Sequence, residues 1–114
     1  YPPVDMVRIV GPSDAFPALD FDPELADEVS PLRHVDAGDA PVLIQHGTTD
    51  QLVPLLGSRM MLNALEKAGV PAELEIYEDA GHGFDGEDAA RSSDLARRWF
   101  DRWLLPSSAP ETRD

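Results

Sequence analysis

The sequence contains no cysteine in its 114 residues, which excludes disulfides, thiolate metal ligands and cysteine nucleophiles. It also lacks an apolar run near the roughly 20 residues that cross a bilayer, so we expect no membrane-spanning segment. Methionine is absent from the first position, since the chain begins Tyr1-Pro2-Pro3. We therefore expect the start of the gene product to lie outside this sequence. Any signal that sets the compartment would lie there too, so the sequence leaves the localisation unknown.

Basic residues are also scarce, with nine Lys and Arg against 22 Asp and Glu, which makes the formal net charge −13. Negative charge of this size repels nucleic-acid phosphates and anionic lipids, so we expect neither a nucleic-acid partner nor a membrane partner. With 42% hydrophobic residues the chain belongs to the globular class. Its length allows one domain at most.

Regular structure is predicted to be sparse in residues 1–40, which are rich in proline, aspartate and glycine. These residues favour turns and interrupt helices, so we expect an irregular segment with at most a short helix, near Pro23–Val29. A stretch of this length without regular structure usually lies across another part of a protein.

A regular pattern extends over residues 41–105. Short apolar or alternating runs predict strands, and apolar residues that recur every three or four positions predict helices. The predicted order is strand, helix, strand, helix, at residues 41–47, 54–68, 71–78 and 87–105. Asp85 or Asp88 is placed to cap the start of the last helix. Residues 106–114 are predicted to be a flexible tail.

Two strands joined through a helix form a right-handed parallel crossover. Parallel strands normally need cover on both faces and neighbours at both edges, and two strands make a poor sheet by themselves. We therefore predict an α/β unit that is incomplete on its own. It either forms part of a larger parallel sheet or pairs with another chain.

Asp50 follows the first predicted strand and His82 follows the second. The carboxyl ends of parallel strands meet on one rim of a sheet, where open α/β sheets carry out their chemistry. An aspartate bonded to one imidazole nitrogen fixes the tautomer and stabilises the imidazolium that forms when the other nitrogen takes a proton. Two blander interpretations remain: Asp50 as a cap for the following helix, and His82 as an exposed loop residue. Glycines on both sides of His82 are expected to let its loop turn sharply off the strand.

The segments PVLIQHGTTDQLVP (41–54) and GSRMMLNALEKAGVPAELEIYEDAGHGF (57–84), followed by an amphipathic helix, resemble the C-terminal part of an α/β-hydrolase. The resemblance is closest to the esterase/lipase and prolyl-oligopeptidase-like branch, which includes acetyl-xylan and feruloyl esterases. It implies that the unit is the C-terminal portion of that family's parallel sheet. In the family, H-G-x-x-D-x-x-V-P carries the acid of the catalytic triad and G-H-x-F carries its histidine. These patterns fall on Asp50 and His82. His46, the histidine of the first pattern, is predicted to have a structural role with its ring bonded near the strand end.

The sequence departs from the family in having no G-x-S-x-G motif, which carries the nucleophilic serine upstream of the acid. The resemblance therefore implies a C-terminal fragment of a serine carboxylic-ester hydrolase that carries the acid and base but not the serine. It implies a small ester substrate and no metal or organic cofactor. The acidic run at residues 85–89 lacks the spacing of a calcium loop.

Three hypotheses follow. In the first, the chain is a fragment of a serine esterase that is inactive alone and is completed by the missing N-terminal half of the hydrolase. In the second, it is a non-enzymatic α/β module that self-associates with another copy of the chain through an open strand edge. In the third, Asp50 and His82 activate water by themselves, which retains little of the rate of a full triad. We favour the first.

Overall fold

The computed structural model describes residues 2–12, 14 and 17–106. The described chain divides after Gly83 into two compact parts, which are described separately below. The four elements predicted beyond residue 41 are all present, with bounds within one residue of those expected. No helix in the described part of the chain is long and apolar enough to cross a membrane.

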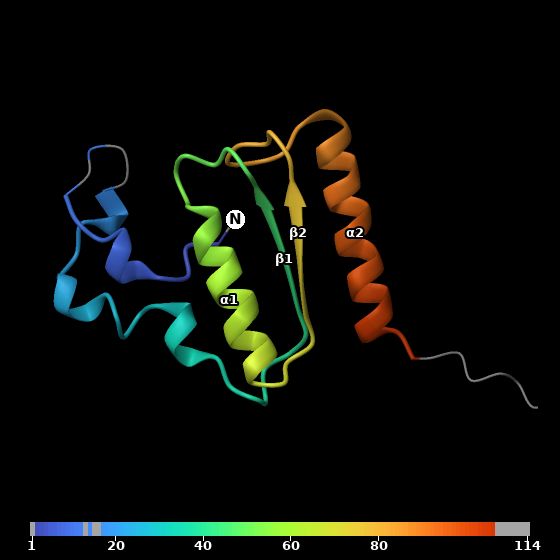
Figure 1. The fold of residues 1–114 in the computed structure, drawn as a ribbon, viewed down its shortest axis with the longest axis horizontal. Coiled ribbons are helices and arrows are strands. Elements are labelled where there is room, and N and C mark those ends of the chain that lie inside the picture. Colours follow the sequence, from blue (N-terminus) through green and yellow to red (C-terminus); the bar gives the residue numbers. More distant parts are fainter. Residues whose placement is uncertain (1, 13, 15–16, 107–114) are drawn as a thin grey trace, which may run out of the picture. The chain divides into compact units, whose positions relative to one another are not determined.

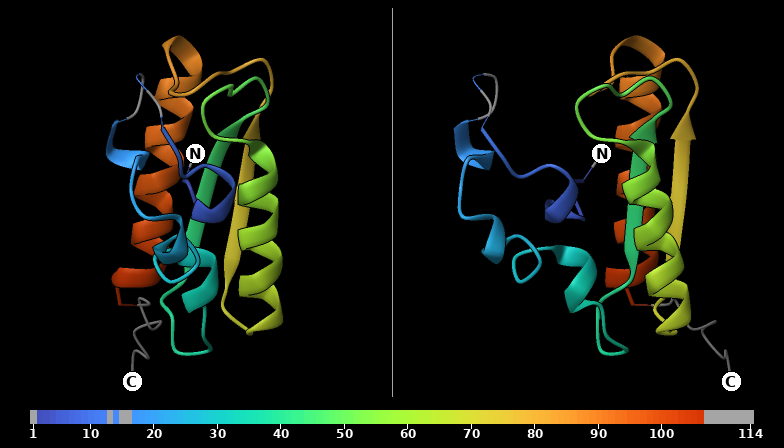
Figure 2. Two further views of the ribbon diagram at one scale, coloured as in Figure 1. Left: turned by 90° about the vertical axis from the view of Figure 1, so that its left-hand side faces the viewer. Right: turned by 60° about the vertical axis from the view of Figure 1, so that its left-hand side comes forward.

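The centre of the first part is a parallel pair of strands, β1 (Val42–Gly47) and β2 (Ala72–Tyr77), paired from Val42 opposite Ala72 to Gly47 opposite Tyr77. Helix α1 (Leu55–Lys67) connects them and lies along one face of the pair (Figures 1 and 2). Ile44, Leu65 and Val70 are the buried residues of the core between helix and strands. The predicted α/β class with parallel strands is thus confirmed.

The end of α1 shows how the sequence directs the chain into β2. Gly69 lies just past the helix with a φ of 77°, a left-handed conformation that glycine adopts without steric cost. Its amide donates to the carbonyl of Glu66, and the amide of Val70 donates to the carbonyl of Leu65. This pair of bonds is a Schellman motif, and its usual apolar contact is supplied by the core residues Leu65 and Val70.

The segment over residues 1–40 contains four short 3₁₀ helices among its described residues, where the sequence predicts at most one short helix. They are Met6–Arg8, Pro17–Leu19, Pro23–Leu25 and Pro31–His34. Three of them begin at a proline, whose fixed φ suits a first turn. Turns of three or four residues show no sequence periodicity, which is why they were not predicted.

Long-range hydrogen bonds hold this segment together, and the segment lies beside α1 (Figure 2). The amide of Leu32 donates to the carbonyl of Val4, and the amide of Met6 donates to the hydroxyl of Ser30. The Ser30 hydroxyl in turn donates to the carbonyl of Ala26. Since Val4, Ala26 and Ser30 are buried, the segment has a small packed centre of its own.

The second part contains helix α2 (Gly86–Leu104). Asp85 occupies its N-cap position, but the Asp85 side chain makes no capping hydrogen bond, so the predicted cap is wrong in that respect. The Trp99 and Trp103 rings lie one turn apart with centroids separated by 5.8 Å. Of the predicted tail at residues 106–114, all but residue 106 lies outside the described residues.

Candidate active site

The loops that follow β1 and β2 bring Asp50 and His82 together, although 32 residues separate them. The Nδ1 atom of His82 lies 3.0 Å from Oδ2 of Asp50. The Asp50 side chain is 0% exposed and that of His82 is 33% exposed. The acid is therefore enclosed while the imidazole remains accessible. This is the arrangement expected from two parallel strands that end on the same rim.

Asp50 is held by its own loop. Its Oδ1 atom accepts the amides of Leu52 at 2.9 Å and Val53 at 2.8 Å, which leaves Oδ2 to face the imidazole. Burial by itself raises the pKa of Asp50, but the bonds from Val53, His82 and Leu52 outweigh burial and hold the pKa below its ordinary value. Asp50 thus stays a carboxylate at neutral pH. Helix α1 has no side-chain cap, so Asp50 does not have the alternative role of a helix cap.

The loop that carries His82 lies directly against the end of β1. A Cβ atom placed on Gly47 would lie 2.2 Å from the carbonyl oxygen of Ala80 and 2.7 Å from that of Gly81. The amide of Thr49 donates to the Ala80 carbonyl at 3.0 Å, and the Thr48 hydroxyl accepts the amide of Asp79 at 2.8 Å. Only glycine at position 47 allows the loop this close approach. The approach fixes the path of the backbone that leads to His82.

The two glycines that flank His82 differ in their conformations. Gly83 has a φ of 113°, in the region that side chains with a Cβ rarely adopt. Gly81 has no such φ, and a Cβ on it would meet open space. The expectation that both glycines make the turn is therefore right for Gly83 and wrong for Gly81.

His46 lies beneath this pair and is fully buried. Its Nδ1 atom is 2.6 Å from the hydroxyl of Ser58 in α1, and its Nε2 atom is 2.8 Å from the carbonyl of Val53. The Nε2 atom also lies 3.2 Å from Oδ2 of Asp50. Burial is the largest influence on the ring and lowers the pKa of His46. The predicted bonded ring near the strand end is confirmed, and its contact with the acid is an additional finding.

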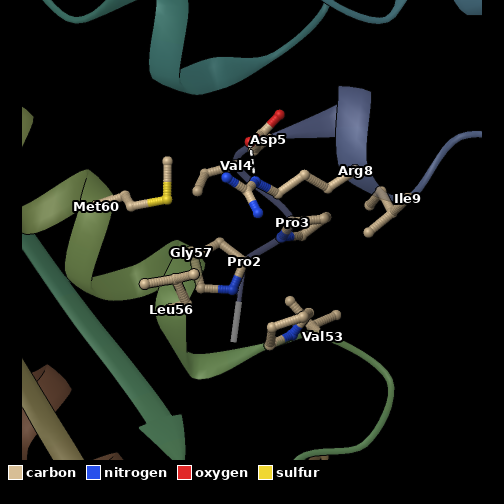
Figure 3. A pocket seen from close by; sticks show the side chains of 11 residues that line it. Pro2, Pro3, Val4, Asp5, Arg8, Ile9, Val53, Leu56, Gly57 and Met60 are labelled. Atoms are coloured by element: carbon tan, nitrogen blue, oxygen red, sulfur yellow. Dashed lines mark hydrogen bonds and ion pairs between the residues drawn. The ribbon is translucent and has the colours of Figure 1, made fainter.

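An apolar cavity of about 210 Å³ lies between the N-terminal segment and the start of α1 (Figure 3). Its walls include Pro2–Val4 on one side and Leu56, Gly57 and Met60 on the other. Val53 also lines it, so the cavity shares a wall with the loop that holds Asp50. Asp50 and His82 themselves do not line the cavity.

Among the residues that the structure describes, no group of three or more His, Cys, Asp or Glu side chains is arranged to hold a metal ion. The chemistry available at the rim is that of a carboxylate and an imidazole. An imidazole held at Nδ1 by a carboxylate can take and return a proton at Nε2.

Comparison with known proteins gives this geometry a context. The sequence profile of the prolyl oligopeptidase family matches residues 13–107. Dipeptidyl-peptidase 5 of Porphyromonas endodontalis is 36% identical over 76 residues, which cover 66% of this chain and 11% of that protein.

Two solved esterases superpose on the chain. A thermophilic esterase of the planctomycete Thermogutta terrifontis, Est2, gives a TM-score of 0.63 at 35% identity, covering 74% of this chain and 33% of that one. It has also been solved with butyrate bound and phosphorylated by paraoxon. A truncated carbohydrate esterase from gut microbiota gives a TM-score of 0.64 at 30% identity, covering 84% of this chain and 39% of that one. The chain thus spans well under half the length of each of these relatives.

Proposed function

The chain belongs to the prolyl oligopeptidase family and has the fold of part of an α/β-hydrolase, and on that premise we propose that it supplies the acid and base of a serine carboxylic-ester hydrolase. Asp50 is the acid and His82 the base. The observation that carries the proposal is the 3.0 Å contact between Oδ2 of the buried Asp50 and Nδ1 of the exposed His82. The 114-residue chain is inactive alone, because the sequence has no G-x-S-x-G motif to supply the nucleophile.

In the proposed reaction a serine outside this chain attacks the carbonyl carbon of the ester. The serine proton passes to Nε2 of His82, and Asp50 stabilises the imidazolium through Nδ1. His82 then returns that proton to the departing alcohol, which leaves an acyl-serine. Water repeats the sequence with His82 as base, releasing the acid and regenerating the serine. These steps need no metal or organic cofactor.

The choice of an ester over a peptide rests on the two esterases that superpose on most of this chain. Peptide hydrolysis is the competing activity, favoured by the similarity to a dipeptidyl-peptidase.

A non-enzymatic module that self-associates is the second candidate. The observation that favours it is the sheet itself, which has two strands in the described chain and so offers edges for a further strand. The same edges would accept strands from the missing half of the hydrolase. Sedimentation of the 114-residue chain distinguishes the self-associating module from the hydrolase fragment, because a stable oligomer is expected only for the module.

The test of the enzymatic proposal uses the intact enzyme, meaning this chain joined to the segment that supplies the serine. We expect hydrolysis of p-nitrophenyl butyrate, little turnover of a dipeptidyl p-nitroanilide, and loss of nearly all turnover in His82→Ala. His34→Ala is the matched control, because His34 is an exposed histidine far along the chain and is expected to keep full activity. Near-normal turnover in His82→Ala contradicts the proposal.

A further inference from the structure

The proposed reaction uses Asp50 and His82 but leaves a second histidine unexplained. His46 is completely buried and makes contacts at both of its ring nitrogens. A buried polar ring of this kind is normally satisfied by its neighbours, so the question is which groups its neighbours are. One of them is the carboxylate oxygen that faces His82.

The contacts determine which nitrogen of His46 carries the proton. A backbone carbonyl can only accept, so Nε2 must be the donor toward Val53, and Oδ2 of Asp50 lies 3.2 Å from the same nitrogen. Because burial lowers the pKa of His46, the ring is neutral at neutral pH and Nδ1 has no proton. Nδ1 is therefore an acceptor, and the Ser58 hydroxyl donates to it.

These contacts form a closed cycle of interactions that includes both carboxylate oxygens of Asp50. Oδ1 of Asp50 accepts the amide of Val53, the carbonyl of Val53 accepts from Nε2 of His46, and that same nitrogen lies 3.2 Å from Oδ2 of Asp50. A rotation of the Asp50 side chain would break contacts on both of its oxygens. Ser58, which is 0% exposed in α1, links the His46 imidazole to that helix through its hydroxyl.

We infer that His46 and Ser58 are positioning residues that hold Oδ2 of Asp50 in line with Nδ1 of His82. This inference rests on the proposed function for its catalytic consequence, although the geometry it concerns is independent of the reaction. His46 does not touch substrate and exchanges no proton during turnover. It acts by fixing the orientation of Asp50, with its own tautomer fixed by the Ser58 hydroxyl.

A role in packing alone makes a different prediction from a role in positioning. Packing depends on the volume of the side chain, whereas positioning depends on an N–H group at the site of Nε2. His46→Leu fills much of the volume without a donor, and His46→Gln places an amide N–H within reach of the same acceptors. The pair therefore separates the two roles, provided both variants fold.

The first measurement is proton NMR of the imidazole N–H groups in the intact enzyme, with the His82 signal assigned by its absence from His82→Ala. We expect the His82 N–H signal to be lost or broadened in His46→Leu and retained in His46→Gln, with the circular dichroism unchanged in both. A sharp, unshifted His82 signal in a folded His46→Leu variant would overturn the inference.

Ser58→Ala provides the second variant in case His46→Leu does not fold. It removes one hydroxyl and leaves the imidazole in place, and Ser93→Ala in α2 is its exposed control. We expect Ser58→Ala to weaken the His82 N–H signal and Ser93→Ala to leave it unchanged. An unchanged signal in Ser58→Ala would remove Ser58 from the positioning pair.

Kinetics of the same variants test the catalytic consequence. We expect kcat to fall about 10- to 100-fold in His46→Leu with KM within about threefold of its normal value, and His46→Gln to recover most of kcat. Equal losses in both His46 variants, with the NMR signal intact, would favour packing alone. Full activity of His82→Ala would instead refute the proposed function and leave the NMR result standing.

Discussion

The two loops on the rim are held in different ways. The loop after β1 is held by side-chain bonds, with one carboxylate bonded to two amides and facing two imidazoles. The loop after β2 is held mainly by its backbone, which lies against Gly47 and bonds to Thr49. The first arrangement encloses its functional residue and the second leaves a third of His82 exposed. In the proposed reaction the acid only orients the base and can be buried, whereas the base exchanges protons with the substrate and must be accessible to it.

Among substitutions that leave His82 in place, the largest effect should come from removing the charge of the enclosed acid. Asp50→Asn in the intact enzyme is expected to lower kcat roughly 10⁴-fold, because the amide favours the wrong tautomer of His82. KM for p-nitrophenyl butyrate should change little, since Asp50 does not contact substrate in the proposed reaction. A rise in KM with kcat unchanged would show that Asp50 serves in binding and not in orientation.

A substitution at Gly47 should displace the loop after β2, which packs against that glycine. Gly47→Ala places a methyl group 2.2 Å from the Ala80 carbonyl oxygen, so the loop must move and His82 with it. Overpacking of this kind typically costs about 1–3 kcal/mol of unfolding free energy, and we expect at least a 100-fold loss of kcat as well.

Gly81→Ala is the matched control for that change. A Cβ at position 81 meets open space and the backbone there has no left-handed φ, so the unfolding free energy should change by less than about 1 kcal/mol. Urea denaturation and initial rates of the two variants provide the comparison. Equal effects at positions 47 and 81 would contradict the account of the loop.

The two buried titratable groups, His46 in β1 and Asp50 in the loop after it, should make the stability depend on pH. His46 has a pKa below 6.5 when folded, so the unfolded chain binds the proton first and stability falls as pH drops below 6.5. Asp50 has a pKa below 3.8 when folded, so its contribution is complete above that pH and is lost only in stronger acid. Between about pH 7 and pH 5 the decline therefore comes from His46 and not from Asp50.

His46→Gln isolates that contribution because glutamine does not titrate. The unfolding free energy of this variant, measured by urea denaturation, should depend less steeply on pH between about pH 7 and pH 5 than that of the unmodified chain. The difference in slope cannot exceed about 1.4 kcal/mol per pH unit for one proton. Identical slopes would mean that His46 is not held neutral by burial.

The smallest effect is expected away from both loops, where the N-terminal segment rests on α1. A Cβ on Gly57 would lie 3.3 Å from Cγ2 of Val4, a tight contact that a shift of the Val4 side chain relieves. Alanine is better than glycine inside a helix by about 1 kcal/mol. We expect Gly57→Ala to raise the unfolding free energy by less than that amount, as thermal denaturation would show. A loss of stability would mean that Val4 is held too firmly to move.

The proximity of Asp50 and His82 could be predicted from the topology, whereas their alignment could not. Two parallel strands end on one rim, so the loops that follow them are brought near one another there. The helix and strand bounds were predictable for a similar reason, since apolar periodicity and the glycine after α1 are local signals.

Close approaches between distant segments could not be predicted in this way. The requirement for glycine at position 47 arises from the path of Ala80, more than 30 residues later. Ser58 appears in the sequence as an ordinary residue inside a helix, and its bond to His46 depends on how α1 packs on β1. Gly81 and Gly83 look alike in the sequence and differ only in backbone conformation.

The parallel crossover that unites the site has a consequence for the order of folding. Asp50 and His82 are separated by 32 residues, so they cannot meet until α1 has formed and β2 has docked beside β1. Contacts across a separation of this length carry the entropy cost of closing the chain between them and usually form late. The Asp50 carboxylate can bind the amides of Leu52 and Val53 within its own turn before His82 is in place. The local bonds of the loop after β1 can therefore form before the rest of the site is assembled.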